Sequence, residues 1–222
     1  MGNLYITATP IGNLEDITLR ALSTLKSVDV IICEDTRVTA KLLDHFGIRK
    51  PLVSYHHHSD TRKTNEIKAL LEEGKSLALV TDAGTPGISD PGNQLVSDLV
   101  KSLSGLNIIP VPGVSALTAI LSISGFPTDK FLFMGFPPHK NKRQKFFEEV
   151  SKCEYTVVFF ESGHRIEKCL NDLEKVLDPK REIVIGRELT KKFETIYRGN
   201  IEEIKKQSMN TKGEFVIVVE NI

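Results

Sequence analysis

The sequence predicts an α/β protein that is folded as two domains. Two patterns lead to this prediction: strand-length apolar runs alternate with amphipathic helical stretches, and a Gly/Pro break follows residue 124. The composition agrees with it, since the 222 residues include 40% hydrophobic and 26% charged residues, with 29 basic side chains against 29 acidic ones. This profile is typical of a globular protein and excludes a disordered chain, a collagen or a coiled coil.

Continuous apolar runs at 4–8, 28–33, 77–81 and 108–111 have the length of strands. Runs without polar alternation are typical of strands that are buried on both faces of a parallel sheet. Apolar residues at helical spacing lie between the runs: Ile17, Ala21, Leu22 and Leu25; Ile67, Leu70 and Leu71; Leu95, Val96, Leu99 and Leu103. Strand and helix in alternation predict βαβ units.

The second half of the chain begins after one more predicted helix, at 114–124. Gly125, Pro127 and Thr128 break the pattern there, so we expect domains at 1–124 and 128–222. Strands are predicted at 131–135, 155–160, 183–186 and 215–219, and Ile166, Leu170, Leu173 and Leu177 mark a helix. We expect this half to be more antiparallel than the first, with 195–198 pairing against the final strand.

Composition and the ends of the chain also bear on its location and partners. No apolar run approaches the ~20 residues of a spanning helix, and the N-terminus lacks the pattern of a signal peptide. Three dispersed cysteines, Cys33, Cys153 and Cys169, favour a reduced, cytoplasmic protein in which they are small core residues. Because the charges balance, any nucleic acid must be bound by local basic patches.

The densest motif is the Gly/Pro-rich loop at 81–92, between a predicted strand and a helix. Open parallel sheets bind ligands at the carboxyl ends of their strands, and the three glycines of this loop let backbone approach a ligand. The alternative is a tight turn in which Ser89 or Asp90 caps the next helix. Twelve residues exceed the ~2–6 of a plain connection, which favours a binding loop.

Two smaller loops, 9–13 and 112–116, follow other predicted strands, so the three loops together predict a pocket at one edge of the sheet. Known phosphate fingerprints do not explain it. Gly74-Lys75-Ser76 resembles the end of a P-loop, but Ala69 stands where the upstream glycine is required, and no G-x-G-x-x-G occurs.

Three polar segments could contact a substrate. Among His56, His57 and His58, alternate residues of an extended segment share a face, so we favour a polar or RNA-facing loop and expect no metal site. In 34–37, either Asp35 or Thr36 caps a helix, or the segment contacts substrate. The basic run at 139–145 is either a solvated helix face or a phosphate-binding surface.

Six segments in order along the chain carry a resemblance to a known family. They are LYITATPIGNLEDITLRAL, ICEDTR, LVTDAGTPGISDPG, VPGVSALTAILSISGFPTDKFLFMGF, FFESGHR and GRELTKKFE. The chain resembles the bacterial 16S ribosomal RNA (cytidine 2′-O)-methyltransferases, a branch of the tetrapyrrole-methylase-like class III enzymes that use S-adenosylmethionine (SAM). The resemblance implies two α/β/α domains with SAM in an interdomain cleft, a homodimer, and methylation of the ribose of a decoding-centre cytidine in the 16S rRNA of the 30S subunit.

The resemblance also implies positions for the cofactor. The residues that would bind SAM are Pro10, Ile11 and Gly12; Asp82, Gly84, Thr85 and Ile88; Ser115 and Ala116; and, from the second domain, Phe160 and Gly213. The tetrapyrrole enzymes have Gly-Asp-Pro where this chain has Gly84-Thr85-Pro86, so their aspartate contact has no counterpart here.

Ribose methylation needs a group that takes up the hydroxyl proton, and Asp35, His56 and Glu188 are the candidates. Arg37 and Arg187 could bind phosphates bidentately. The basic run would add Lys140, Lys142, Arg143 and Lys145. Two other functions stay open: methylation of a tetrapyrrole or another small metabolite, and a SAM-sensing or ribosome-binding module without catalysis.

Overall fold

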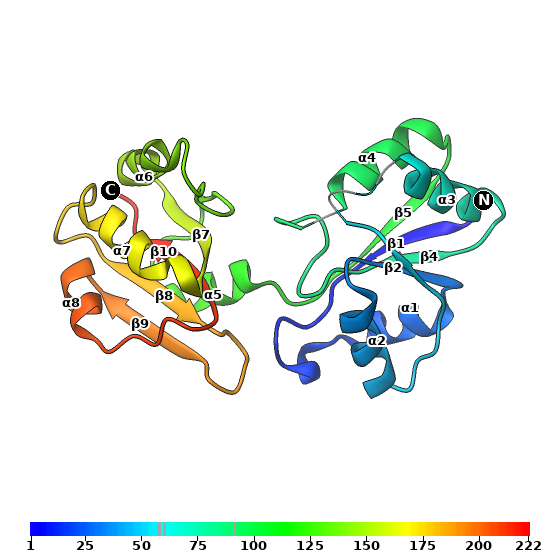
Figure 1. Ribbon diagram of the computed structural model, residues 1–222, viewed down its shortest axis with the longest axis horizontal. Coiled ribbons are helices and arrows are strands. Elements are labelled where there is room, and N and C mark those ends of the chain that lie inside the picture. Colours follow the sequence, from blue (N-terminus) through cyan, green and yellow to red (C-terminus); the bar gives the residue numbers. More distant parts are fainter. Residues whose placement is uncertain (57–58, 60, 91) are drawn as a thin grey trace. The chain divides into compact units, whose positions relative to one another are not determined.

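The computed structural model describes residues 1–56, 59, 61–90 and 92–222. The chain divides into two compact units, Met1–Ser115 and Ala116–Ile222, and each contains one five-stranded sheet with its helices (Figure 1). The α/β class predicted from the sequence is confirmed.

The sheet of the first unit is entirely parallel, with the strand order β3-β2-β4-β1-β5. Its strands are β1 (Asn3–Thr7), β2 (Val30–Cys33), β3 (Leu52–Ser54), β4 (Leu77–Leu79) and β5 (Asn107–Val111). In register, Leu4 of β1 pairs with Leu77 of β4 and with Ile108 of β5. The four predicted strands are present, and the sequence analysis missed β3.

Helices cover both faces of this sheet (Figure 1). They are α1 (Leu19–Ser27), α2 (Thr36–His45), α3 (Thr61–Glu72) and α4 (Asn93–Ser102), with a 3-10 turn at Leu14–Asp16. On one face, Leu25 of α1 and Leu43 of α2 pack against Ile31, and on the other Leu71 of α3 and Leu99 of α4 join a cluster with the remaining core side chains. Burial on both faces explains why the strands read as uninterrupted apolar runs.

The sheet of the second unit is mixed, with the order β6-β7-β10-β8-β9. Its elements are α5 (Ala116–Ser124), β6 (Phe131–Phe133), α6 (Arg143–Lys152), β7 (Thr156–Ser162), a 3-10 turn (Gly163–Arg165), α7 (Ile166–Glu174), β8 (Ile183–Arg187), β9 (Thr195–Gly199), α8 (Ile201–Lys206) and β10 (Glu214–Val219). Only β6 and β7 pair in parallel, so the predicted antiparallel character is confirmed.

The predicted partner of 195–198 is wrong. Strand β9 pairs with β8, its neighbour in sequence, because both edges of β10 are already occupied by β7 and β8. Two antiparallel strands that are joined by a short loop pair with each other most readily.

The boundary between the units lies earlier than the sequence predicts. Helix α5 packs against β8 and β10 and therefore belongs to the second unit, which begins at Ala116. Gly186 permits this packing, because a Cβ at that position would lie 2.8 Å from the Cδ1 atom of Ile120. The Gly/Pro break after α5 is thus a turn inside the second unit.

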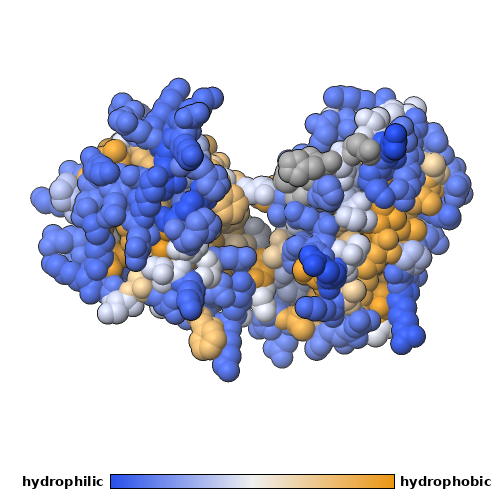
Figure 2. Space-filling model, in the orientation of Figure 1, coloured by the Kyte–Doolittle hydropathy of each residue, from blue (hydrophilic) through white to orange (hydrophobic). Residues whose placement is uncertain are grey.

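Polar side chains dominate the surface of the face shown in Figure 2, with hydrophobic residues in patches on both units. In the part of the chain that the structure describes, no helix is long and apolar enough to cross a membrane. Cys33 and Cys169 are buried, as predicted, and burial raises the pKa of both thiols.

Candidate functional site

The three loops that follow β1, β4 and β5 meet at the edge of the first sheet that is formed by the carboxyl ends of these strands. Thr9 and Gly84 exchange two backbone hydrogen bonds, at 2.9 and 3.1 Å, and the N–H of Ala8 donates to the carbonyl of Val111 at 3.1 Å. The hydroxyl of Thr9 donates to the carbonyl of Thr81 at 3.0 Å. The convergence predicted from the sequence is therefore present, and backbone groups hold it together.

Glycines make this close approach possible. A Cβ on Gly113 would lie 2.8 Å from the Cβ of Ala8, and one on Gly84 would lie 3.3 Å from Cγ2 of Ile11. Gly84 also has a φ of +82°, which side chains rarely adopt. Pro10 and Ile11 are buried beneath the edge, whereas Gly12 is exposed. The first loop therefore offers mainly backbone to a ligand.

The Gly/Pro loop is not a simple helix cap. The N-cap of α4 is Gly92, so neither Ser89 nor Asp90 takes that position. Gly87, at φ +84°, accepts a 2.7 Å hydrogen bond from the side-chain amide of Asn93, which fixes the middle of the loop. The side chain of Ile88 is left 44% exposed.

Two buried hydroxyl groups lie where strands end at this edge. The Oγ1 atoms of Thr7, in the last position of β1, and of Thr81, just after β4, have no hydrogen-bond partner among the described residues. Such groups are uncommon in folded proteins, because an unpaired buried hydroxyl costs about 1–3 kcal/mol. Exposed backbone at Gly12 and Gly113 and an unpaired hydroxyl suit a polar small molecule with donor and acceptor groups, as SAM is.

The 34–37 segment adjoins the same loop. Asp35 is the N-cap of α2, and its carboxylate accepts hydrogen bonds from the backbone N–H of Arg37 at 2.8 Å and from its guanidinium at 2.6 Å. These bonds lower the pKa of Asp35 to about 2. The N–H of Asp35 donates to Asp82 at 3.2 Å, and burial raises the pKa of Asp82. Asp35 is therefore a helix cap and a weak base.

His56 is exposed at the end of the segment that follows β3, and its backbone N–H donates to Ser59 at 2.9 Å. His57 and His58 lie outside the described residues. Within the described ranges, no group of three His, Cys, Asp or Glu side chains could hold a metal ion.

In the second unit, Glu188 and Gly213 lie against each other. Glu188 has a φ of +52°, and its carboxylate accepts from the N–H of Glu214 at 2.9 Å and from the ammonium of Lys191 at 3.1 Å. Burial alone would raise the pKa of Glu188, but these hydrogen bonds outweigh it and lower the pKa. A Cβ on Gly213 would lie 2.6 Å from Cγ of Glu188, so the glycine leaves room for that side chain.

Two arginines that we predicted to bind phosphate are buried instead. Arg187 is 7% exposed, and its guanidinium donates to the carbonyls of Lys212 at 2.7 Å and of Phe193 at 2.9 Å. Arg143 is 5% exposed and pairs with Asp172 at 2.8 Å. These predictions are wrong because buried, paired guanidinium groups cannot reach RNA. Lys140, Lys142 and Lys145 of the same basic run are exposed.

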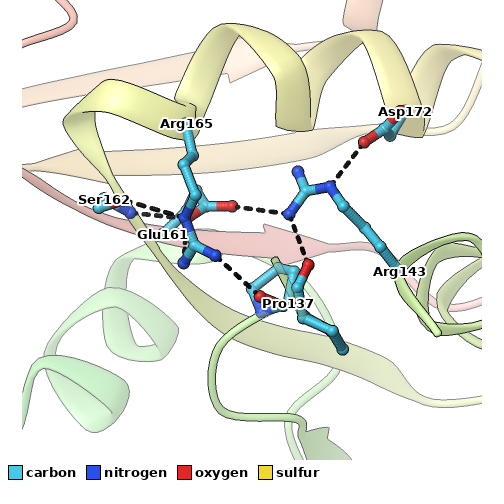
Figure 3. Close-up of polar contacts among 7 residues, drawn as sticks. Pro137, Arg143, Glu161, Ser162, Arg165 and Asp172 are labelled. Atoms are coloured by element: carbon cyan, nitrogen blue, oxygen red, sulfur yellow. Dashed lines mark hydrogen bonds and ion pairs between the residues drawn. The ribbon is translucent and has the colours of Figure 1, made fainter. Parts of the chain in front are cut away.

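Arg143 belongs to a cluster that the sequence analysis missed. The buried carboxylate of Glu161 pairs with Arg165 at 2.6 Å and with Arg143 at 3.4 Å (Figure 3). The guanidinium of Arg165 also donates to the carbonyl of Pro137 at 3.0 Å, and that of Arg143 donates to the carbonyl of Pro138 at 3.2 Å. We call Arg143, Glu161 and Arg165 the Glu161 cluster; it fixes the loop that carries Lys140 and Lys142 and that leads into α6, where Lys145 lies.

Phe160 precedes this cluster on β7. Its ring packs between those of Phe133 and Phe136, with centroid distances of 5.0 and 5.4 Å. It is half-buried, while Phe136 is 50% exposed.

The two sheets define a two-unit α/β protein in which three loops meet at one edge of the first sheet, and solved structures share this fold. The structure of the methyltransferase CobJ matches with a TM-score of 0.74 and 17% identity, covering 100% of this chain and 95% of that one. Diphthine synthase matches with a TM-score of 0.71 and 15% identity, covering 99% and 90%. At these identities the likeness establishes the fold alone.

Sequence comparison identifies the family. Residues 3–205 match the model of the tetrapyrrole (corrin/porphyrin) methylases, and the chain belongs to this family. Among its relatives are proteins named ribosomal RNA small subunit methyltransferase I. That of Synechocystis sp. is 46% identical over 99% of this chain and 79% of its own length, and that of Escherichia coli O157:H7 is 44% identical over 99% and 78%. The resemblance seen in the sequence is confirmed.

Proposed function

We propose that the protein is a SAM-dependent methyltransferase that acts on the 2′-hydroxyl of a decoding-centre cytidine in 16S rRNA. One observation carries the proposal: a protein named ribosomal RNA small subunit methyltransferase I is 46% identical over 99% of the chain. The glycine-formed edge of the first sheet supports it, because it suits a polar cofactor that is bound through backbone.

The residues proposed to bind SAM belong to the three loops, together with the unpaired hydroxyl beside them. Gly84 and Gly113 would allow the cofactor close to the backbone, and the hydroxyl of Thr81 would bond to one of its polar groups. Thr85, Ile88 and Ser115 would complete the contacts. Ala116, Phe160 and Gly213 belong to the second unit and stay proposals on the resemblance.

SAM supplies a methyl group on a sulfonium, which is already activated for displacement. The chain must orient the acceptor oxygen and take up its proton. Asp35 and Glu188 suit proton uptake poorly, since both carboxylates are engaged in hydrogen bonds that lower their pKa values. His56 is the candidate that remains, because histidine is the side chain that exchanges protons near neutral pH.

Lys140, Lys142 and Lys145 are proposed to contact RNA phosphates. They are exposed, and the Glu161 cluster fixes the loop at Pro137 and Pro138, which precedes them in the chain. Arg37 is exposed as well, but its guanidinium already pairs with Asp35. The cysteines favour a cytoplasmic protein. A homodimer, as the resemblance implies, would place two such surfaces on one RNA, and sedimentation equilibrium would measure that association.

The decisive experiment incubates the purified protein and labelled SAM with 30S subunits from a strain that lacks the gene. We expect label in 16S rRNA, in a cytidine whose ribose methyl group makes the adjacent bond resistant to alkali. Incorporation into a precorrin instead would support metabolite methylation. SAM binding by calorimetry without transfer to either substrate would support a sensor. The Gly113→Val variant, whose added atoms would meet Ala8 where two of the loops touch, is the matched control for labelling that depends on this edge of the sheet.

A further inference from the structure

The loop that joins β8 to β9 exposes an aromatic ring to solvent. We call residues 188–194 the Phe193 loop. The side chain of Phe193 is 67% exposed, more than Phe131 at 40% or Phe136 at 50%. Lys192 is exposed too, and its ammonium lies 5.6 Å from the centre of the Phe193 ring.

The Phe193 loop has a strained backbone that many contacts hold in place. Glu188 and Thr190 both have positive φ, at +52° and +66°. Strained residues persist only where the surroundings fix them, and they concentrate at functional sites. Here the N–H of Thr190 donates to the carboxylate of Glu194 at 2.6 Å. The N–H of Lys191 donates to the carbonyl of Glu188, and the N–H of Glu194 donates to the carbonyl of Lys191, both at 3.0 Å.

The carbonyl of Phe193 itself is fixed from inside the unit. The guanidinium of Arg187 donates to it at 2.9 Å and also to the carbonyl of Lys212, just before β10. Lys191 adds ion pairs of 3.1 Å to Glu188 and 2.8 Å to Glu214. A buried arginine and the ion pairs of Lys191 therefore hold the backbone that carries the Phe193 ring, while the ring itself packs against little of its own unit.

We infer that Phe193 stacks on an unpaired base of the RNA substrate, with Lys192 close to the adjoining phosphate. An aromatic face beside a cation is the arrangement that binds single-stranded nucleic acid, because every base has a face that can stack. Fixing the backbone that carries the ring lowers the entropy lost on binding. The inference rests on the proposed function, and it gives Arg187 and Glu188 the role of positioning residues.

Tyr155 provides a matched control. It is an exposed aromatic residue of the same unit, at 44%, and the ammonium of Lys130 lies 5.8 Å from its ring centre. It stands just before β7 instead of on a strained loop. If any exposed aromatic residue beside a lysine could bind the RNA, replacing Tyr155 or Phe193 by Ala would weaken RNA binding equally.

The test compares Phe193→Ala, Phe193→Trp, Phe193→Leu and Tyr155→Ala with the wild type, on 30S subunits from a strain that lacks the gene. For Phe193→Ala we expect KM for the subunit to rise about tenfold, the loss of one base stack, with kcat and the Kd for SAM unchanged. Phe193→Trp should restore KM, Phe193→Leu should not, and Tyr155→Ala should leave it unchanged. Filter binding of 16S rRNA, which needs no turnover, should show the same order in Kd.

Three results would overturn the inference while the proposed function stands: a Phe193→Ala enzyme with wild-type KM, rescue by leucine equal to that by tryptophan, or a rise in KM that is accompanied by dissociation of a dimer in sedimentation. If the wild type transfers no methyl group to the subunit, the proposed function fails instead. The filter-binding series then still decides whether Phe193 contacts RNA.

Discussion

The two units fix their loops by different means. In the first, loops are held by backbone-to-backbone hydrogen bonds, such as those between Thr9 and Gly84, and by glycines that let chain segments touch. In the second, buried or half-buried arginines donate to backbone carbonyls of loops and of the end of α6: Arg143 to Pro138, Arg165 to Pro137, Arg181 to Ser151, Cys153 and Glu220, and Arg187 to Lys212 and Phe193.

This difference suits the tasks that we assign to the units. Loops that present mainly backbone at the edge of the sheet leave room for a small cofactor. A guanidinium has five donors in a fixed plane, so one arginine can hold two or three loop carbonyls while side chains on the outside stay available to a large partner.

The largest expected effect is on the arginine side of this comparison. Replacing Glu161 by Ala leaves the buried Arg143 and the half-buried Arg165 without their common carboxylate, so the free energy of unfolding should fall by about 3–5 kcal/mol. Urea denaturation measures the loss, and hydrogen exchange should locate it in 134–172 with β1 to β5 still protected. In the control, Glu174→Ala removes an exposed pair with Lys205 and should cost under about 1 kcal/mol. Equal losses in the two variants would contradict the role of the cluster.

On the glycine side, Gly113→Val should lower SAM affinity more than about tenfold, because the added atoms meet Ala8 where the loops touch. Calorimetry measures the affinity. Gly105→Ala is the control: its φ is +82° and nothing lies within 4 Å of the added Cβ, so it should cost about 1 kcal/mol of stability without changing affinity. Equal SAM affinity in both variants would contradict the proposal that the close contact between these loops shapes the SAM site.

A smaller effect is expected from Thr81→Val. If its unpaired hydroxyl bonds to SAM, affinity should fall about 3- to 10-fold, while stability should not decrease, because no hydrogen bond within the protein is lost. Thr156→Val should do the reverse, since it removes a 2.6 Å hydrogen bond to Pro127 far from the loops in sequence. Thermal unfolding and calorimetry on both variants separate the two effects, and unchanged affinity in Thr81→Val would exclude the hydroxyl from the site.

The smallest effect concerns the exposed ion pair of the first unit. Arg37→Ala should raise the pKa of Asp35 from about 2 toward the ordinary value of ~3.9. Because the folded pKa is depressed, the stabilisation by this pair is complete above the unfolded value and disappears as the pH falls toward 2. Carboxyl NMR titration measures the shift. Lys41→Ala, on the same helix, should leave it unchanged, and an unshifted Asp35 in Arg37→Ala would refute the assignment.

Apolar runs located four strands of the first sheet, of which β2 and β4 are buried along their whole length. The glycine content of 81–92 singled out a loop that meets the 9–13 loop, and its role in binding a ligand stays a prediction. Strand β3 was missed because it contains only two apolar residues in a row, Leu52 and Val53, which is too short a run to indicate a strand. Helix α2 was expected only through a cap at Asp35 or Thr36, because just Thr39 and Leu43 of this helix are buried.

Long-range pairing is what local patterns could not supply. Arg143 reads as part of a basic surface run, yet its partners Glu161 and Asp172 lie 18 and 29 residues away. Arg187 likewise reads as a phosphate ligand until the fold places the carbonyls of Lys212 and Phe193 around it. A charged residue in a polar stretch gives no local sign that it is buried.

The open side of β5 has a consequence for how the protein behaves at high concentration. Pro110 lies in this edge strand opposite Ile6, and it has no N–H to offer to another chain. Its carbonyl already accepts a 3.1 Å hydrogen bond from Arg20 of α1. At this point an incoming strand finds neither donor nor acceptor, which protects the parallel sheet from edge-to-edge aggregation.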